Sequence, residues 1–307
     1  GMQNIYFFSE YALEDWEYEI AQAKEYGGIV IANIVAYSAS EMAYVAKRVE
    51  KFGADAVELC LSTPYGDGIE VLASEPEKVY EFVDEVVKAV DIPVMVKLSP
   101  SVNNVAKLAK AAEKAGAAAI SGINTIRSIL GVDIEKGKTL LPTYGGYSGH
   151  AIRPISLAFT ATVAQATNLP VCSIGGIDTY HHVLEYMMLG ANTVQVCTSA
   201  VLNGYGHITK MIQDLEKWMK DHHYENFEQI RGKALNSLKS FEEMKVEPYI
   251  AEVVDDTSDT GGDEYENSCI FGAIYRNENR LKVDPEKCTG CGLCANRWPD
   301  IFKMIWK

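Results

Sequence analysis

The feature that most restricts the fold of this chain is a repeated alternation of short apolar runs and amphipathic stretches. The apolar runs are typical of parallel strands that are covered on both faces. They lie at residues 29–35, 56–62, 93–99, 118–124, 170–176 and 193–199. Helical patterns follow them at residues 40–51, 75–89, 104–115, 155–167, 179–189 and 207–222.

Strand–helix units in series predict a parallel α/β sheet with right-handed crossovers. A complete (β/α)8 barrel has eight units in roughly 250 residues. This chain has six clear units, preceded by a starting segment at 4–8 and a helical pattern at 13–26. We therefore predict a (β/α)8 TIM-barrel type of fold that is incomplete at the N-terminus. An open doubly wound sheet is the alternative.

The formal net charge of −14 argues against nucleic acid as a partner, because phosphate binding needs a basic face. No apolar run approaches the roughly 18 residues that span a bilayer, so we expect no membrane segment. We predict a cytoplasmic protein that binds small molecules or another protein. The seven cysteines are an odd number and do not suggest a disulfide framework.

The strand–helix pattern ends near residue 245. We predict a barrel over residues 1–245, an acidic linker over 246–266 and a small α+β module over 267–307. In this module three cysteines have C-x2-C-x2-C spacing, which places three thiolates around one concavity. They are Cys288, Cys291 and Cys294. An iron–sulfur cluster is the first interpretation, and a zinc site or plain structural cysteines are the alternatives.

The module resembles bacterial ferredoxins, whose motif continues to a fourth cysteine that serves a second cluster. Trp298 stands at that fourth position here. The run at 269–274 resembles the end of a first ferredoxin half-motif, whose cysteine crosses over to the cluster of the later trio. The resemblance therefore implies a ferredoxin-like module with a single [4Fe–4S] cluster. The implied ligands are Cys269, Cys288, Cys291 and Cys294.

Polar residues and glycines follow the predicted strands at their C-terminal ends, where barrel enzymes keep their chemistry. They are Ser62, Thr63, Lys97, Asn124, Thr125, Gly175, Gly176, Cys197 and Thr198. Glycines and a hydroxyl after the last two strands are typical of a phosphate site in barrels. The backbone N–H groups of Gly175 and Gly176 could hold a phosphate without any cation.

With these segments in place, the chain resembles the dihydroorotate dehydrogenase superfamily. It is most similar to the dihydropyrimidine dehydrogenase branch, which carries a ferredoxin module after the barrel. The segments at 143–149, 151–154, 175–178, 195–197 and 232–235 carry the resemblance, which covers nearly the whole chain.

The resemblance implies FMN as a cofactor and hydride transfer between the flavin and a CH–CH bond of a pyrimidine-like ring. Lys97 would stabilise negative charge on the reduced flavin. A salt-bridged lysine at a strand end is the plainer interpretation of this residue. The residues implied around the ribityl phosphate are Gly146, Gly175, Gly176, Cys197 and Thr198. Those implied for the substrate are Cys60, Ser62, Asn124 and Thr125.

Three departures from the family pattern matter. Thr63 stands at the proton-transfer position, which is cysteine or serine in other branches, and a turn-capping threonine is the plainer interpretation. Cys60 replaces an asparagine and Tyr65 a smaller polar residue, which leaves open a substrate other than a pyrimidine. In relatives two βα units precede residue 4, so we expect a homo-oligomer contact or a cover from residues 1–27 at that gap.

Two hypotheses of function follow. The first is an FMN-dependent oxidoreductase of the dihydropyrimidine or dihydroorotate dehydrogenase type. Its [4Fe–4S] cluster would exchange electrons with a flavoprotein subunit or a ferredoxin, because no GxGxxG motif follows a strand. The second is a non-catalytic iron–sulfur electron-transfer or accessory subunit with a degenerate barrel. A barrel that binds another phosphorylated ligand is a third option. The histidine pairs at 181–182 and 222–223 lack a third metal ligand nearby in sequence and are expected at the surface.

Overall fold

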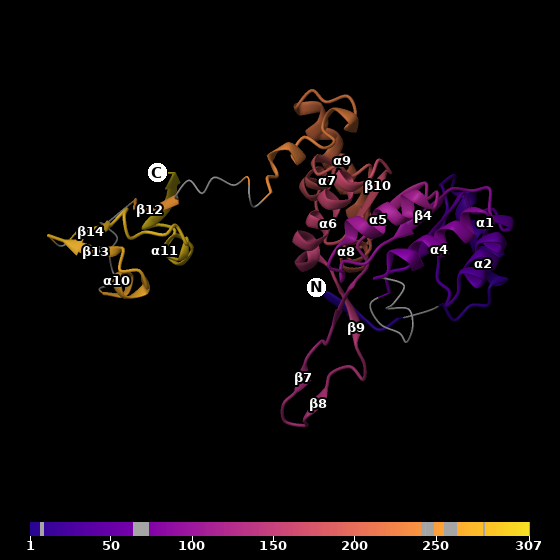
Figure 1. Cartoon of the computed structure of the whole chain (residues 1–307), viewed down its shortest axis with the longest axis horizontal. Coiled ribbons are helices and arrows are strands. Elements are labelled where there is room, and N and C mark those ends of the chain that lie inside the picture. The colour runs from indigo at the N-terminus through magenta and orange to yellow at the C-terminus, as the bar shows by residue number, and fades with distance from the viewer. Residues whose placement is uncertain are drawn as a thin grey trace. The chain divides into compact units, whose positions relative to one another are not determined.

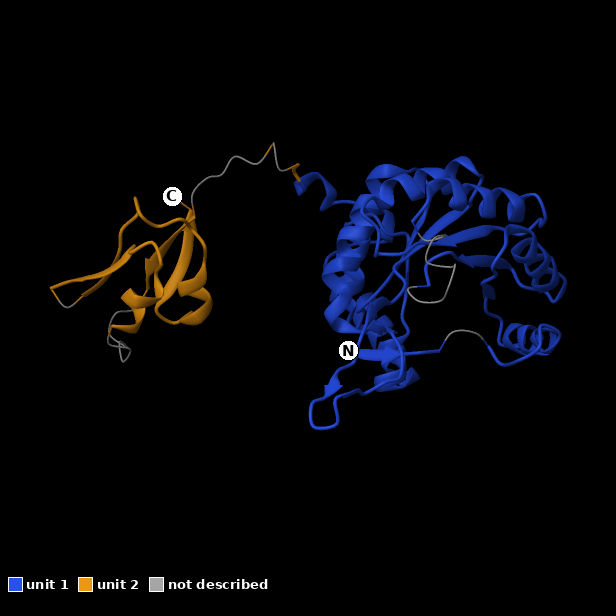
Figure 2. Ribbon diagram, turned by 60° about the horizontal axis from the view of Figure 1, so that its bottom comes forward, with its two compact units in different colours: residues 1–238 blue, residues 239–307 orange. Residues whose placement is uncertain are grey.

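The computed structural model describes residues 1–6, 9–63, 74–240, 243, 249–254, 263–278 and 280–306. The chain divides into two compact units, residues 1–238 and residues 239–307 (Figure 2). Phe8, which ends the predicted starting segment, and Tyr65 lie outside the described residues.

The first unit is built on one parallel sheet whose six strands all lie at predicted positions (Figure 1). They are β2 (Ile31–Ile34), β3 (Ala56–Cys60), β4 (Val94–Lys97), β5 (Ala119–Gly122), β10 (Val171–Ile174) and β11 (Thr193–Gln195). Neighbours in the sheet follow chain order from β2 to β11 without reversal. A doubly wound sheet reverses its order at a switch point, so the barrel-type prediction is confirmed. Within the described residues the sheet has six strands, which makes an incomplete barrel.

Helices connect the strands and pack beside one another against the sheet (Figure 2). They are α1 (Asp15–Glu25), α2 (Ala39–Lys51), α4 (Pro76–Val87), α5 (Val105–Lys114), α6 (Arg153–Ala166), α7 (Tyr180–Met188), α8 (Thr198–Asn203) and α9 (Tyr205–Asp221). Short 3₁₀ turns lie at η1 (His150–Ile152), η2 (Phe227–Gln229) and η3 (Leu235–Ser237). The core forms where helix residues such as Val83 meet strand residues such as Val96, and both are fully buried. Among the described helices, none combines the length and apolar character needed to cross a membrane.

One glycine explains how the chain turns from α7 into β11. Gly190 has a φ of +99°, a conformation that favours glycine. A β-carbon there would also lie 2.6 Å from the Cβ of Ala164 in α6. Gly190 therefore ends α7 and lets it pack closely on its neighbour, as the sequence pattern indicates.

The starting segment does not join the parallel sheet. Instead β1 (Met2–Asn4) pairs antiparallel with β9 (Gly145–Ser148), which also pairs with β6 (Ile126–Ser128). A hairpin of β7 (Val132–Asp133) and β8 (Lys138–Thr139) extends from this small sheet (Figure 1). Sequence analysis missed β6 to β9 because none of them contains the apolar run that marks the barrel strands. The small sheet matters because it brings the chain start to the C-terminal ends of the barrel strands.

The second unit is a small α+β module, as predicted. Strand β12 (Tyr249–Val253) pairs with β15 (Phe302–Trp306), and β13 (Ile274–Asn277) pairs with β14 (Arg280–Val283). Helices α10 (Glu264–Ser268) and α11 (Leu293–Arg297) complete the unit. Both β12 and α10 use residues from the segment expected to be a linker, because their apolar side chains are needed in the module's core. The bounds of the three predicted segments stay predictions.

Trp298 has the apolar role that its place in the ferredoxin motif suggests. Its ring packs edge-on against Tyr265, with ring centroids 4.8 Å apart and an interplanar angle of 79°. Ile301 and Phe302 are buried beside these rings. A tryptophan at this position therefore fills the core of the small module, and edge-to-face packing of this kind is favourable.

Candidate functional site

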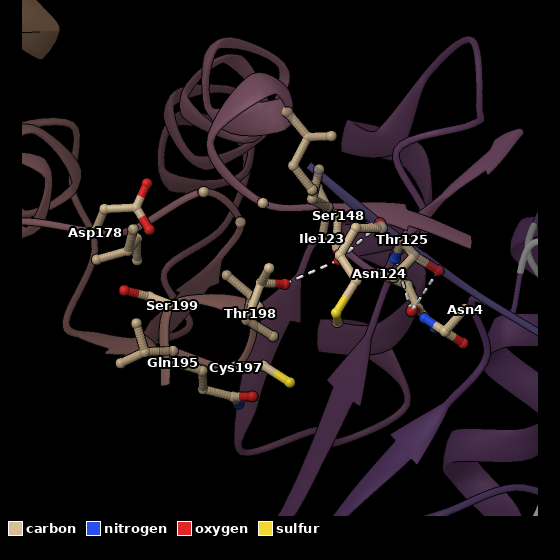
Figure 3. Close-up of a pocket in the computed structure, with 18 of the residues that line it drawn as sticks. Asn4, Ile123, Asn124, Thr125, Ser148, Asp178, Gln195, Cys197, Thr198 and Ser199 are labelled. Atoms are coloured by element: carbon tan, nitrogen blue, oxygen red, sulfur yellow. Dashed lines mark hydrogen bonds between the residues drawn. The ribbon is translucent and has the colours of Figure 1, made fainter. Parts of the chain in front are cut away.

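A cavity opens at the C-terminal ends of the barrel strands (Figure 3). The predicted site residues that line it are Lys97, Asn124, Thr125, Gly175, Gly176, Cys197 and Thr198. Asn4 of β1 and Ser148 of β9 also line it, and sequence analysis missed both because the pairing of β1 with β9 is a long-range contact. The fold thus gathers residues from distant segments at one place, and their roles stay predictions.

Glycines form one wall of this cavity. Gly175 and Gly176 have φ values of +135° and +67°, and Gly149 has a φ of +96°. A β-carbon on Gly176 would lie 2.8 Å from the Cβ of Arg153 and 2.9 Å from the carbonyl oxygen of Gly149. This wall therefore needs glycine for its backbone conformation and for close packing. A backbone without side chains is the surface that an anion such as phosphate can approach closely.

Tyr186 supports the glycine wall through a hydrogen bond to its backbone. It is a fully buried residue of α7, and its hydroxyl donates to the carbonyl oxygen of Gly175 at 2.6 Å. Burial raises the pKa of Tyr186 to about 12, so the hydroxyl stays a donor throughout the neutral range. Beside it, the hydroxyl of Thr198 donates to that of Ser148 at 2.8 Å, which ties α8 to β9.

Gly146 is a predicted site residue in β9 that does not itself line the cavity. A β-carbon at this position would lie 2.0 Å from the Oγ1 of Thr125. Glycine there allows β9 to pack directly over Thr125. The structure therefore puts Gly146 beside Thr125, and its role at the ribityl phosphate stays a prediction.

A buried carboxylate lies beneath Lys97. Glu58 is 4% exposed, and its Oε2 lies 3.5 Å from the Nζ of Lys97. The Oε1 accepts hydrogen bonds from Ser121 at 2.6 Å and from Gln195 at 3.0 Å, and Oε2 accepts one from Asn33 at 2.5 Å. Lys97 is therefore ion-paired, as its plainer interpretation expected, and it also lines the cavity.

Burial acts to raise the pKa of Glu58, but the charge of Lys97 and the three hydrogen bonds outweigh it. The pKa of Glu58 therefore lies below its usual value, and the residue is a carboxylate at neutral pH. Sequence analysis missed it. The available signal was an acidic residue within the otherwise apolar run at 56–62, since an unpaired charge is rarely buried.

The residues predicted to read the substrate form a connected group. The amide of Asn124 donates to the hydroxyl of Ser62 at 3.1 Å and lies 3.4 Å from the sulfur of Cys60. That sulfur lies 3.5 Å from the Oγ1 of Thr63. Cys60 and Ser62 are buried, whereas Thr63 is half-buried. Through this group the Thr63 hydroxyl contacts the Cys60 thiol, which in turn contacts the Asn124 amide. A thiol forms only weak hydrogen bonds, whereas an amide forms ordinary ones.

Histidines gather at the rim near the glycine wall. The donor atoms of His150, Asp178 and His182 lie within 4.8 Å of one another, although sequence analysis found no third ligand for His182. The Asp178 carboxylate accepts from His150 at 3.0 Å, and the backbone N–H of Asp178 donates to the Nδ1 of His182 at 3.1 Å. Burial, and after it the charge of Arg153, lowers the pKa of His182, in keeping with a neutral acceptor. These hydrogen bonds account for the three residues without a metal ion.

The four predicted cluster ligands line one hollow in the second unit. They are Cys269, Cys288, Cys291 and Cys294. The backbone N–H groups of Ala251 and Ala273 point at the sulfurs of Cys288 and Cys269, at 3.4 and 3.3 Å. The remaining lining residues are mostly apolar, among them Ile270, Phe271 and Leu293.

The backbone around this hollow also suits a cluster. Gly290 has a φ of +72°, and a β-carbon there would lie 2.3 Å from the carbonyl oxygen of Tyr249. Burial raises the pKa of the Cys294 thiol, so binding as a thiolate requires a positive centre beside it. Four cysteines around one apolar hollow, two of them with a backbone N–H pointing at the sulfur, fit a [4Fe–4S] cluster.

Comparisons with known proteins agree with both units. The sequence pattern of the dihydroorotate dehydrogenase family matches residues 8–219, and that of a 4Fe-4S single cluster domain matches residues 281–305. The second match favours an iron–sulfur cluster over zinc. It begins after Cys269, whose role as fourth ligand stays a prediction.

Individual relatives include the catalytic subunit of dihydroorotate dehydrogenase B (NAD(+)) from Thermoplasma volcanium. It is 36% identical over 235 residues, which cover 76% of this chain and 77% of the relative. Dihydropyrimidine dehydrogenase (NADP(+)), chloroplastic, from Arabidopsis thaliana is 33% identical over 256 residues, which cover 76% and 59%. The NAD-dependent dihydropyrimidine dehydrogenase subunit PreA from Escherichia coli is 28% identical over 309 residues, which cover 96% and 68%. On its family match, its identity to these relatives and its incomplete barrel, this chain belongs to the dihydroorotate dehydrogenase family and carries a 4Fe-4S domain.

Proposed function

We propose that this chain is an FMN-dependent oxidoreductase that acts on a CH–CH bond of a pyrimidine-like ring and exchanges electrons through its [4Fe–4S] cluster. The observation that carries this proposal is the cavity at the strand ends, where Lys97, Asn124 and the glycine wall meet. It joins a cation, an amide and an anion-binding backbone in one place. FMN, when bound, supplies an acceptor or donor of hydride.

The glycine wall would bind the phosphate of the cofactor. Gly149, Gly175 and Gly176 give this wall a backbone without side chains, and Thr198 adds a hydroxyl at the same wall. Tyr186 fixes the wall through the carbonyl of Gly175. Backbone N–H groups bind phosphate well because they carry fixed partial positive charge.

Lys97 would stabilise negative charge on the reduced ring system. Its side chain is 16% exposed, so its ammonium group is only partly screened by water. Cys197, just after the C-terminal end of β11, would also lie along the cofactor, as it lines the same cavity.

Asn124, Thr125 and Ser62 would orient the substrate ring through hydrogen bonds. Thr63 would hold or deliver the proton at its Oγ1, with the sulfur of Cys60 at 3.5 Å as its neighbour. Because Cys60 replaces an asparagine, the ring need not carry the full pyrimidine pattern of donors and acceptors.

The electron partner would be a separate flavoprotein subunit or a ferredoxin. The name of the Escherichia coli relative, which describes a subunit of an NAD-dependent enzyme, supports a partner that handles the nicotinamide cofactor. We also expect a homo-oligomer and a cytoplasmic location.

The second candidate function is a non-catalytic iron–sulfur subunit with a degenerate barrel. Two features favour it. The amide of Asn124 already bonds to protein groups, and Cys60 and Thr63 stand where the family has other residues. Both features would weaken hydrogen bonding to a substrate. The complete glycine wall and the cavity position of Lys97 oppose it.

Anaerobically purified protein separates the two candidates. An absorption spectrum with flavin bands beside the broad cluster absorption is expected, together with flavin oxidation by a pyrimidine or flavin reduction by a dihydropyrimidine. A spectrum of the cluster alone that added FMN does not change would favour the non-catalytic subunit.

A further inference from the structure

Glu58 is the centre of a polar network that spans the barrel sheet. Its partners Asn33, Lys97, Ser121 and Gln195 come from β2, β4, β5 and β11. Among the described residues, Glu58 is the one buried residue with an ionisable carboxylate or ammonium group. A buried charge is costly unless it is paired, so a residue of this kind needs a role.

The network holds Lys97 by an ion pair but leaves hydrogen-bond donors of its ammonium group free of Glu58. Three hydrogen bonds of 2.5 to 3.0 Å satisfy the carboxylate, while Lys97 lies further away at 3.5 Å. The ammonium group therefore keeps donors for a group in the cavity that it lines. The partners from three other strands fix the carboxylate, and the carboxylate in turn fixes the ammonium.

We propose that Glu58 is a positioning residue that holds the Lys97 ammonium in place at the cavity through its negative charge. Without the carboxylate, Lys97 would lie in a largely buried place with no opposite charge, and its proton affinity would fall. The other titratable groups near Lys97 are Cys60, its register partner on β3, and Cys172 on β10. Burial raises the pKa of Cys172, so this thiol stays neutral and cannot replace Glu58. That this role serves catalysis rests on the proposed function, in which Lys97 stabilises charge on the reduced cofactor.

The test is the titration of Lys97 in flavin-free full-length protein by NMR of 13Cε-labelled lysine. The variant Lys97→Arg assigns the resonance. Glu58→Gln keeps the shape and removes the charge, and we expect it to lower the proton affinity of Lys97 at least ten-fold. Ser121→Ala removes one hydrogen bond and keeps the charge, so the titration should stay near that of the wild type.

An unchanged titration of Lys97 in Glu58→Gln would overturn the proposal, since a purely structural residue would leave it unmoved. Should Glu58→Gln fail to fold, Glu58→Asp is the second test, because its shorter side chain moves the carboxylate away from Lys97 by one methylene. Glu58→Asp should lower the proton affinity of Lys97 by a smaller factor than Glu58→Gln, and no decrease at all would overturn the proposal. FMN binding is measured in a separate experiment on the wild type. If the wild type does not bind FMN, the proposed function is rejected, but the Lys97 titration still tests the role of Glu58.

Discussion

Replacing Lys97 by methionine should destabilise the barrel unit strongly at neutral pH. The change keeps most of the side-chain volume and removes the positive charge that faces the buried Glu58 carboxylate. At 3.5 Å, and with an effective dielectric constant of about 20, the lost attraction is at most about 5 kcal/mol. Breaking a buried pair typically costs about 3–5 kcal/mol. Because Lys97 keeps some exposure, we expect about 3 kcal/mol.

The loss should depend on pH in a defined direction. In the wild type the pKa of Glu58 is lowered, so its contribution to stability is present above the unfolded pKa and disappears as pH falls through the folded pKa. In Lys97→Met the opposite charge is gone, so we expect the pKa of Glu58 to rise relative to that in the wild type, and the buried carboxylate to be most costly at neutral pH. The difference in unfolding free energy between the two proteins should therefore narrow as pH falls from 7 towards about 4.3.

Urea unfolding followed by far-ultraviolet circular dichroism measures this difference, because most helices belong to the barrel unit. The control is the double variant Lys97→Met with Glu58→Gln, which should recover much of the loss since no unpaired charge remains. A loss that does not change with pH, or a double variant as unstable as the single one, would refute the reasoning.

Three further predictions concern the two proposed cofactor sites and the proposed proton-transfer residue. Gly176→Val should abolish FMN binding in a fluorescence titration because its side chain would enter the wall, whereas Gly206→Ala, where nothing lies within 4 Å, should bind normally. Thr63→Ala should slow turnover at least 100-fold, within the typical range for acid–base groups, with flavin content unchanged; equal turnover would remove Thr63 from the mechanism. Cys291→Ser should lose most cluster absorption and iron, whereas Cys172→Ser, in a buried strand of the barrel, should retain both. Retained iron in Cys291→Ser would contradict its assignment as a ligand.

Much of the barrel could be predicted from sequence because each strand and helix carries its own local pattern. Lys97 and the glycines at 175–176 were predicted as site residues for the same reason, since they lie at the C-terminal ends of apolar runs. The chain order of the strands in the sheet followed from the handedness of strand–helix units.

What could not be predicted depends on contacts between distant segments. The pairing of Met2–Asn4 with β9 has no local signal, so Asn4 and Ser148 were missed as cavity residues. The partners of Glu58 lie on four other strands, and only the folded sheet brings them together. Tyr186 gave no sign that it supports Gly175 from another element, because a tyrosine in a helical pattern is usually a core residue.

The most direct test of this account is a crystal structure of the protein grown with FMN under anaerobic conditions. We predict flavin density in the cavity, with its phosphate against Gly175 and Gly176 and its ring system within reach of Lys97. A cavity that stays empty, or a flavin bound at another place, would contradict the account even if the cluster is present.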